Sequence, residues 1–538
     1  MTDEPKRNTK GQSFVVIGRR DVLFGALLVS VSLGAACTSD TPALASPFQH
    51  GIASGDPLPD AVILWTRLTP QDAGATEMDV AWAVAEDAAM ERVVAKGDLR
   101  TNKERDFTVK VDARGLAPGR TYYYRFTALG VPSRVGRTKT APRGPVDRLR
   151  FALVSCSSLA HGHFHGYREI AQKGDLDAVV HLGDYIYEYG SSDYGDVRPY
   201  EPANELVTLA DYRTRHAQYK RDPDLAAVHR QHPFVVIWDD HEIANDGFKD
   251  GAQNHNPPDG SWTDRKAAAM RAYMEWMPIR EQEGGRIYRK LSFGDLADLV
   301  LLDTRYHGRT VQARGTVGNA IGPPPSPDPA RTLLGDDQAA WMEGELQRST
   351  AQWKLLGQQV MVANLTLDVG KSIANLDQWH GYPESRKRFM GFLRDANVKN
   401  VVVLTGDIHS SWANELADNP HDATLYDPAN GKHAIAVEIV TPGITSPGIP
   451  ALFLGILDEA RPKNPHIRWV DGSKRGFVLL DVTRERVQAA WYHFEDVTIT
   501  APQAPTFASA WAVRAGETRL FPEERPATPR EGQAPPVT

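Results

Sequence analysis

The stretch VVHLGDYIYEYG, Val179–Gly190, indicates both the fold and the chemistry of this chain. An apolar run that suits a buried strand ends in Gly-Asp, and tyrosines follow the aspartate at one and three residues. A turn would need the glycine and the aspartate, but it would not need Tyr187. A metal site would use the oxygens of both Asp184 and Tyr187, so the end of this strand is a candidate metal site.

Continuous apolar runs recur along the middle of the chain, and helical patterns separate them. Such runs are typical of strands that are covered on both faces. The helical pattern Ser261–Met277 has Ser261 or Thr263 as its expected N-cap. We therefore predict a layered α/β domain over residues 146–505. Its predicted strands lie in Arg150–Cys156, Asp177–Asp184, Phe234–Glu242, Leu296–Arg305, Trp353–Leu365 and Asn400–Ser411.

Residues 46–145 have a different pattern. Short segments alternate large apolar and polar residues, and turn residues separate them: Ala61–Leu68, Met78–Ala85 and Arg120–Gly130. Strands without intervening helices predict a small β-sandwich. The stretch APRGPVDR, residues 141–148, is typical of a linker.

The first 45 residues are predicted to be an export signal. Arg19 and Arg20 precede an apolar run of 15 residues, Val22–Ala36, which is shorter than the roughly 20 residues that span a bilayer. The paired arginines favour the twin-arginine export machinery, with cleavage after Ala45 and a secreted or cell-envelope location. The alternatives are an anchor kept in the mature protein and a lipid on Cys37; we expect no permanent membrane span.

Composition and net charge narrow the classes of function that this chain can have. The chain has 538 residues, 41% of them hydrophobic, and a net charge of −7, which argues against a nucleic-acid binder that neutralises phosphates. Its two cysteines are Cys37 and Cys156. Removal of the signal would leave Cys156 without a partner for a disulfide, so in an oxidising compartment it should be buried or bound to a metal.

Metal-binding residue types gather where the predicted strands end. A single aspartate after a strand is usually a turn or a helix cap, but several such endings within one domain favour a shared ligand site, because ligands collect at the carboxyl ends of strands. The candidates are Cys156, Asp184, Tyr187, Asp239, Asp240, His241, Asp407 and His409.

On these motifs the chain resembles the PhoD-type alkaline phosphatases of the metallophosphoesterase superfamily. The stretches that carry the resemblance are SCSS, HLGDYIYEYG, WDDHEIANDG, LLDTR and GDIHSSW, and WHGY at Trp379–Tyr382 departs from the family pattern. The resemblance implies a fibronectin-like N-terminal sandwich, a catalytic domain that holds metals, and hydrolysis of phosphate esters with Fe3+ and Ca2+. Some relatives act as phospholipases D.

Donor chemistry divides the candidates between two ions. Thiolate and tyrosinate donors suit Fe3+, so we assign Cys156, Asp184, Tyr187 and His409 to the first ion. An oxygen-rich set suits Ca2+, so we assign Asp184, one or both of Asp239 and Asp240, and Asp407 to the second ion.

Other residues have predicted roles near these ions. The family pattern implies that His241 contacts substrate or protonates the leaving group. Arg305 either binds phosphate or forms an ion pair with Asp303 or another carboxylate. Asn245 and Asp246 are expected near the ions.

Several further segments are expected to be structural. Tyr185 and Tyr189 are predicted to be packed aromatics, and His161–Tyr167 to be loop and helix-start residues near the pocket. Residues 318–338 suggest a surface or lid loop. Residues 506–538 form a C-terminal extension that we expect to be partly disordered, from Pro522 onward.

The predicted reaction is hydrolysis of phosphate mono- and diesters by metal-activated water. No histidine is followed two positions later by lysine, which excludes His-x-Lys phospholipase D chemistry. Two alternatives remain: a phospholipase D-like phosphodiesterase of the same fold, acting on phospholipid or polymer, and a non-catalytic cell-surface binding protein.

Overall fold

The computed structural model describes residues 46–315, 321–367 and 374–537. The predicted signal, with Arg19, Arg20 and Cys37, lies outside the described residues, as do the first residues of the predicted lid loop. Across the described ranges, no helix has the length and apolar character needed to cross a membrane.

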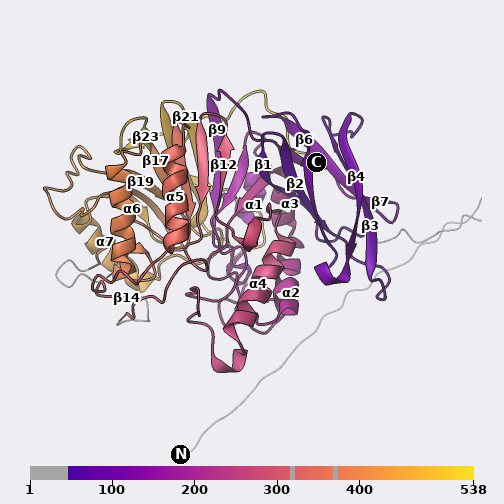
Figure 1. The fold of residues 1–538 in the computed structure, drawn as a ribbon, viewed down its shortest axis with the longest axis horizontal. Helices are drawn as coiled ribbons and strands as arrows, with labels where there is room; N and C mark the ends of the chain where they lie inside the picture. Colours follow the sequence, from indigo (N-terminus) through magenta and orange to yellow (C-terminus); the bar gives the residue numbers. More distant parts are fainter. Residues whose placement is uncertain (1–45, 316–320, 368–373, 538) are drawn as a thin grey trace, which may run out of the picture. The chain divides into compact units, whose positions relative to one another are not determined.

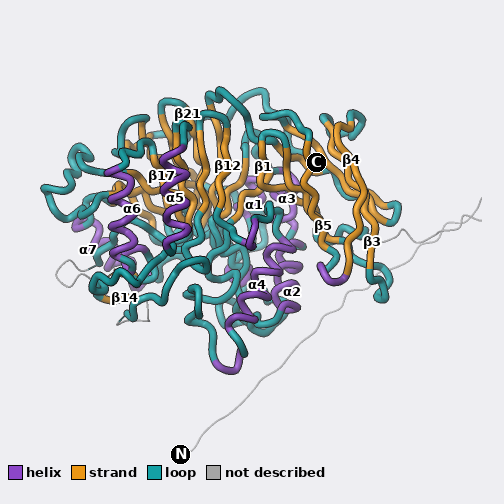
Figure 2. Tube along the Cα trace, viewed as in Figure 1, coloured by secondary structure: helices purple, strands orange, loops and turns teal. Residues whose placement is uncertain are grey.

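A ten-stranded sheet forms one layer of the fold (Figures 1 and 2). Its central strands β9, β10, β11 and β1 run parallel, with Val179 of β10 paired between Ala152 and Phe234. In spatial order the sheet contains β24 (Leu520–Glu523), β23 (Thr506–Arg514), β22 (Arg486–Phe494), β21 (Arg475–Thr483), β9 (Arg148–Val154), β10 (Ala178–His181), β11 (Pro233–Val236), β1 (Ile52–Leu58), β2 (Ala61–Arg67) and β5 (Thr108–Arg114).

A seven-stranded sheet forms the second layer, and its strands β13, β15, β17 and β19 also run parallel. In spatial order it contains β12 (Arg289–Phe293), β13 (Ala297–Leu301), β15 (Trp353–Gln358), β17 (Val401–Thr405), β19 (Ala436–Val440), β18 (Ser411–Leu416) and β20 (Ile467–Asp471). In the predicted lid loop, β14 (Ile321–Gly322) forms a two-stranded pair with β16 (Ala374–Asn375), which lies outside that loop.

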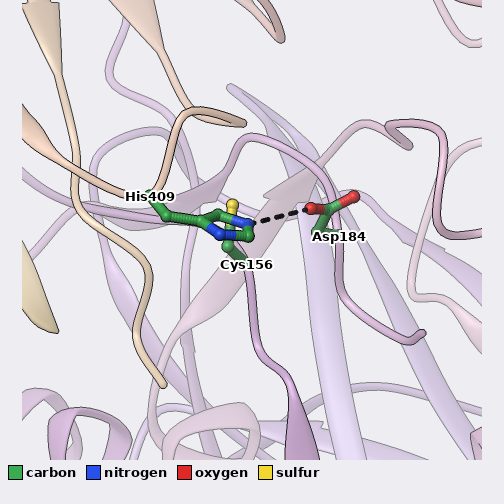
Figure 3. A group of neighbouring side chains, drawn as sticks. All are labelled: Cys156, Asp184 and His409. Carbon is green, nitrogen blue, oxygen red and sulfur yellow. Dashed lines mark ion pairs between the residues drawn. The ribbon is translucent and has the colours of Figure 1, made fainter. Parts of the chain in front are cut away.

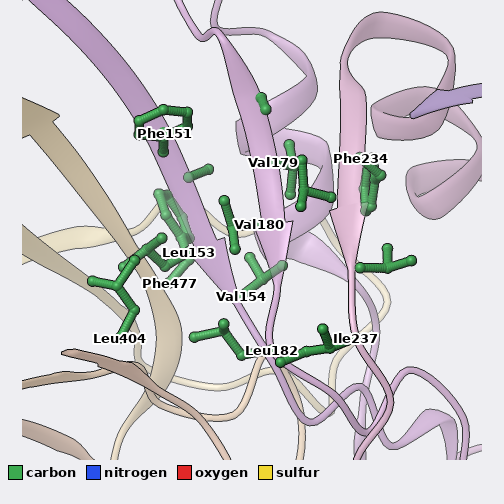
Figure 4. Packing of buried hydrophobic residues seen from close by; sticks show 14 of the residues in the cluster. Phe151, Leu153, Val154, Val179, Val180, Leu182, Phe234, Ile237, Leu404 and Phe477 are labelled. Atoms are coloured by element: carbon green, nitrogen blue, oxygen red, sulfur yellow. The ribbon is translucent and has the colours of Figure 1, made fainter. Parts of the chain in front are cut away.

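The two large sheets share a core. Along β17, Val402 and Leu404 belong to the same buried cluster as Phe151 and Leu153 of β9, whereas Val403 belongs to a second cluster with the helices on the other face. This division follows from the strand geometry, because successive side chains point to opposite faces. Figure 4 shows the packing of Leu404 toward β9. Both faces of the parallel strands are therefore buried, as their continuous apolar runs predict.

Helices cover the outer faces and complete the layered α/β fold that was predicted. Helices α5 and α6 lie over the seven-stranded sheet, and α1, α3 and α4 pack in the larger core cluster (Figure 1). Ser261 is the N-cap of α4, since its hydroxyl accepts a hydrogen bond from Asp264 N. The helices are α1 (His165–Ala171), α2 (Leu209–Lys220), α3 (Pro223–Gln231), α4 (Trp262–Trp276), α5 (Asp336–Arg348), α6 (Pro383–Asp395) and α7 (Ala451–Ala460).

The N-terminal segment forms the predicted sandwich and also joins the central sheet. One of its sheets contains β4 (Val93–Asn102), β3 (Glu77–Ala85), β6 (Thr121–Ala128), β7 (Val131–Pro132) and β8 (Gly136–Lys139). This sheet shares a core with β2 and β5, in which Leu64 and Val111 accompany Val80 and Tyr124. The facing strands belong to the ten-stranded sheet, because β1 pairs with β11.

The C-terminal extension differs from our expectation. Strands β23 and β24 extend the ten-stranded sheet, and the residues after them are held by specific contacts. Arg530 N donates to Asp175 Oδ2 at 2.8 Å, its guanidinium pairs with Asp177 at 2.8 Å, and Val537 N donates to Gln231 Oε1 at 2.9 Å. The prediction of disorder from Pro522 onward is therefore wrong, because a proline-rich composition does not reveal ion pairs to distant strands.

Candidate metal centre

The loops that follow β9, β10, β11 and β17 converge at one edge of the fold. Cys156, Asp184 and His409 bring potential ligand atoms within 4.8 Å of one another (Figure 3). Within this group His409 Nε2 lies 3.7 Å from Asp184 Oδ2. A second group joins Asp184 to Asp240 and His241, and a third contains Asp239, Asp240 and Asp407. All eight candidates from the strand ends, Tyr187 included, therefore lie together.

The backbone at several of these residues adopts a conformation that L-residues rarely use. The φ angles of Cys156, Asp184, Asp407 and His409 are 58°, 56°, 60° and 54°. Left-handed conformations at residues other than glycine are uncommon and gather at functional sites. They turn these side chains out of the strand direction and toward one another.

The two Gly-Asp pairs have a steric origin. A Cβ at Gly183 would lie 2.4 Å from the Cβ of Asp239, and a Cβ at Gly406 would lie 2.9 Å from the Cβ of Ser155. The loops approach so closely that only glycine fits before Asp184 and Asp407. The Gly-Asp motif is thus a consequence of the convergence of the loops.

Tyr187 returns to the aspartate three residues before it. Its buried hydroxyl lies 3.0 Å from Asp184 Oδ2, 3.1 Å from His409 Nε2 and 2.6 Å from Ser446 Oγ. His409 Nδ1 lies 3.1 Å from Pro447 O, so it carries the proton and leaves the Nε2 lone pair directed at this group. The four residues assigned to the first ion therefore converge as donors.

The acidic half of the centre contains a buried arginine. The Arg305 guanidinium forms ion pairs with Asp239 and Asp407, and it also contacts Asp377 at 2.8 Å and Asp240 at 3.5 Å. Of the two roles considered for Arg305, these ion pairs fit the contact with carboxylates. Asp303 is not among these ion-pair partners; its Oδ1 instead accepts the backbone N–H of Arg305 at 2.9 Å.

The carboxylates retain acceptors that the protein does not satisfy. Asp184 Oδ1, Asp239 Oδ2 and Asp240 Oδ1 are buried and have no hydrogen-bond partner. Buried carboxylate oxygens without donors are costly unless a cation meets them. Their position beside thiol, phenol and imidazole donors fits the two ions assigned from the sequence.

The pKa shifts of the buried groups also fit a cation site. Burial, followed by the nearby Asp184 carboxylate, raises the pKa of the Cys156 thiol and of the Tyr187 phenol well above their usual values. Burial raises the pKa of Asp407 to about 7, although Arg305 opposes the shift. Multivalent cations reverse such shifts, because they favour the ionised donor.

His241 has a carboxylate partner that sequence reasoning missed. Its Nδ1 lies 2.7 Å from Glu188 Oε2, and Glu188 also accepts hydrogen bonds from Asn245 N at 2.8 Å and Asn254 Nδ2 at 2.9 Å. Burial alone would lower the pKa of His241, but Asp240 and Glu188 raise it well above the usual value. Glu188 lies inside the stretch that opened the sequence analysis, four residues after Asp184, and that proximity was the available signal.

Glu242 is a second residue that sequence reasoning missed. Its carboxylate accepts the backbone N–H groups of Asp184 at 3.1 Å, Tyr185 at 2.6 Å and Asp239 at 2.7 Å. It therefore fixes the loops after β10 and β11 relative to each other. The sequence DDHE contained this glutamate, but backbone contacts of this kind leave no spacing pattern.

A pocket of about 410 Å³ opens onto the centre. Asn245, Asp246 and Tyr189 line it. Tyr189 is a packed aromatic as predicted, because its ring contacts those of Tyr194 and His241, and it also reaches the pocket. Tyr185 is buried as predicted, and His161 lies in a 3-10 turn, where it bonds Ser158 Oγ at 2.8 Å. Lining residues that the sequence did not reveal are Tyr194, Asn375, Asp377, Gln378, Ile408 and Pro447–Pro450.

A layered α/β fold with a candidate cation centre at its strand ends is typical of a metal-binding enzyme, and comparison with known proteins gives the family. The sequence pattern of PhoD-like phosphatases matches residues 151–491, and that of the PhoD-like phosphatase N-terminal domain matches residues 34–142. The chain belongs to the PhoD-like phosphatase family and is a phosphoric ester hydrolase.

Two individual relatives agree with this assignment. Alkaline phosphatase D of Bacillus subtilis is 38% identical over 540 residues, covering 94% of this chain and 90% of the relative. The solved structure described as "Structure of PhoD" superposes with a TM-score of 0.81 at 36% identity, covering 91% of this chain and 95% of that one. The matches extend over the sandwich and the catalytic layers, which favours a hydrolase over the alternative of a non-catalytic binding protein.

Proposed function

We propose that this protein is an exported, metal-dependent alkaline phosphatase that hydrolyses phosphate mono- and diesters. The observation that carries the proposal is the convergence of three buried carboxylate oxygens that accept no hydrogen bond, on Asp184, Asp239 and Asp240, at a pocket that opens to solvent. The similarity to alkaline phosphatase D of Bacillus subtilis supports the same reaction class.

The donor sets suggest which cation binds where. Cys156, Asp184, Tyr187 and His409 would hold Fe3+, because thiolate and phenolate are electron-rich donors. Asp239, Asp240 and Asp407, with Asp184 between the two sites, would hold Ca2+. When bound, these ions would supply Lewis acidity and lower the pKa of a coordinated water, which favours hydroxide as the nucleophile.

The side chains of the pocket contribute a proton and orientation. Glu188 accepts a hydrogen bond from Nδ1 of His241, so Nε2 is the nitrogen available to the pocket. His241 would donate a proton to the leaving-group oxygen, since the Glu188 carboxylate at its Nδ1 favours the imidazolium form. Gln378 holds Asp407 through a hydrogen bond of 2.6 Å from Nε2 to Oδ2.

The charge of the pocket keeps the phosphodiesterase alternative open. No lysine or arginine occurs among the described residues that line it, and Arg305 is buried behind the carboxylates. A diester carries one negative charge on its phosphate, whereas a monoester carries two at alkaline pH. A phospholipase D-like activity on phospholipid or polymer diesters is therefore the second candidate function.

Metal analysis combined with hydrolysis assays tests the proposal. Purified protein should contain iron and calcium, and a calcium chelator should abolish hydrolysis of a nitrophenyl phosphate monoester and of its matched diester. Added Ca2+ should restore activity better than Zn2+. Full turnover of both substrates by protein shown to contain neither metal would refute the metal-dependent mechanism.

Export is tested separately. Residues 1–45 are proposed to direct the folded protein through the twin-arginine route, so changing Arg19 and Arg20 to lysine should retain active enzyme inside the cell. Unchanged secretion of that variant would exclude this route. Cys37→Ser should leave the released fraction unchanged unless a lipid anchors the protein.

A further inference from the structure

Ser446 links two parts of the proposed first cation site. It lies in the loop after β19, which runs beside the Cys156 loop: Ile444 N donates to Ser155 O at 2.9 Å, and Thr445 Oγ1 donates to Ser158 O at 2.7 Å. The Ser446 side chain is fully buried. Its position is therefore fixed by contacts that do not involve its own hydroxyl.

The Ser446 hydroxyl contacts the phenol directly. Its Oγ lies 2.6 Å from the Tyr187 hydroxyl oxygen and donates to Cys156 O at 2.9 Å, while Ser158 N donates to it at 3.3 Å. A hydroxyl carries one proton. In this arrangement the Ser446 proton goes to the Cys156 carbonyl, and the Tyr187 hydroxyl can donate to Ser446.

Cation binding changes which hydrogen bonds the Tyr187 oxygen can form. A phenol oxygen that binds a highly charged cation has released its proton, so its remaining hydrogen bonds are ones that it accepts. The other two polar groups in contact with it cannot donate: Asp184 is a carboxylate, and His409 Nε2 has no proton because Nδ1 carries it. Among the described residues in contact with this oxygen, Ser446 is the remaining donor.

The loop allows Ser446 to make this exchange. The Cys156 carbonyl also accepts the backbone N–H of Ser446 at 3.2 Å and that of Thr445 at 3.4 Å. Turning the Ser446 hydroxyl toward Tyr187 therefore leaves no buried carbonyl without a partner, which would otherwise cost about 1–3 kcal/mol.

We propose that Ser446 is a positioning residue of the first cation site, which donates a hydrogen bond to the Tyr187 oxygen when that oxygen is a ligand. The inference rests on the proposed role of Tyr187 as a cation donor. Hydrogen bonding withdraws electron density from the phenolate and holds its ring in place. Outer-shell partners of this kind typically contribute about 10- to 100-fold to metal affinity.

Three variants of the Fe3+-loaded protein test the proposal. In Ser446→Ala, the phenolate-to-iron absorption band should move to longer wavelength, because the phenolate becomes more electron-rich. Iron should also be lost to a competing chelator at least 10-fold more readily, because the Tyr187 ring is no longer held in place. Thr445→Val is the matched control, since it removes a hydrogen bond of the same loop that does not reach Tyr187. Its band should stay in place. Tyr187→Phe identifies the band by abolishing its tyrosinate component.

The possible outcomes distinguish a failure of the Ser446 proposal from a failure of the proposed phosphatase function. An unchanged band in Ser446→Ala, or an equal shift in Thr445→Val, would overturn the role of Ser446 while leaving the iron assignment intact. Absence of any tyrosinate band in the Fe3+-loaded parent would overturn both Tyr187 as a ligand and the role of Ser446. Phosphatase assays on the same samples report on the proposed hydrolysis independently of both.

Discussion

The thiol of Cys156 owes its role to its surroundings. A buried cysteine in an apolar environment behaves as a small hydrophobic residue, but this sulfur faces Asp184 and His409 from a left-handed backbone position. An unneutralised carboxylate beside a thiol would be unfavourable if both were ionised. A cation removes this conflict, because it stabilises both anions at once.

Cys156→Ser should therefore remove iron and activity together. Serine nearly preserves the volume but is a poorer donor, and burying its hydroxyl costs about 1–3 kcal/mol at most. Iron stoichiometry, turnover and melting temperature measured on one sample distinguish loss of a ligand from loss of stability. Full iron occupancy with normal turnover would mean that the thiol is structural.

Glu188→Gln should weaken the action of His241 as an acid. The amide cannot stabilise the imidazolium as the carboxylate does across 2.7 Å. General acid catalysis typically contributes 10²- to 10⁴-fold, so turnover should fall by about 100-fold for an alkyl phosphate, whose leaving group needs a proton. A nitrophenyl phosphate, whose leaving group is stable as an anion, should be affected much less. Equal losses on both substrates would contradict the assignment.

Some residues of the centre can be predicted from the sequence, and others cannot. Direct donors such as Asp184 and Asp407 follow apolar strands, and the close packing of loops adds the glycine before each, so both could be predicted. Supporting residues such as Glu242 and Ser446 act through backbone groups of distant loops. No spacing rule links them to their partners, and they emerge only when the chain is folded.

At the scale of elements, the junction between β1 and β11 connects the sandwich to the catalytic layers. Gly55 pairs with Phe234 across this junction, and a Cβ at Gly55 would lie 2.0 Å from Pro278 O and 2.7 Å from Phe234 O. Continuous apolar runs predicted the individual strands well, since burial on both faces leaves a clear pattern. The pairing of β1 with β11 could not be predicted, because it joins segments about 180 residues apart.

Gly55→Ala should destabilise this junction by about 1–3 kcal/mol, the usual cost of overpacking, because the atoms in conflict belong to backbone that cannot rotate away. The midpoint of urea unfolding measures the loss. Gly455→Ala in α7 is the control: the added methyl meets nothing within 4 Å, so stability should be unchanged or slightly higher. Equal unfolding midpoints for the two variants would show that the backbone around Gly55 can move apart without loss of stability.

On the scale of the whole molecule, one buried charge network connects the three parts of the described chain. Lys139 of the sandwich pairs with Asp177 at 2.7 Å, and Arg530 of the C-terminal extension pairs with the same aspartate at 2.8 Å. Arg150 of β9 pairs with Asp175 nearby. The extension is thus an integral part of the fold, and its charges offset carboxylates that would otherwise be buried without partners.

A second property of the whole molecule is its large number of buried neutral bases. Lys220 is buried, its Nζ contacts His229 Nε2 at 3.1 Å and lies over the rings of Trp65 and Tyr185, and burial lowers its pKa well below the usual value. Burial is also the main cause that lowers the pKa to about 3 in His50, His181, His216, His232 and His466. Burial thus favours the neutral form of each of these bases in the folded chain.

These bases should make the protein stable in alkali and sensitive to acid. Because the folded pKa of a buried histidine is near 3 and its unfolded pKa is 6.5, its contribution is fully present above pH 6.5 and is lost as the pH falls toward 3. One such group changes the free energy of unfolding by about 1.4 kcal/mol per pH unit within this window.

His50 packs edge-on against Trp276, so His50→Phe keeps an aromatic ring and removes one proton site. Urea unfolding midpoints between pH 4 and pH 7 should then depend less steeply on pH in the variant, by about one proton. Parallel pH profiles for variant and parent would show that His50 is not a buried neutral base.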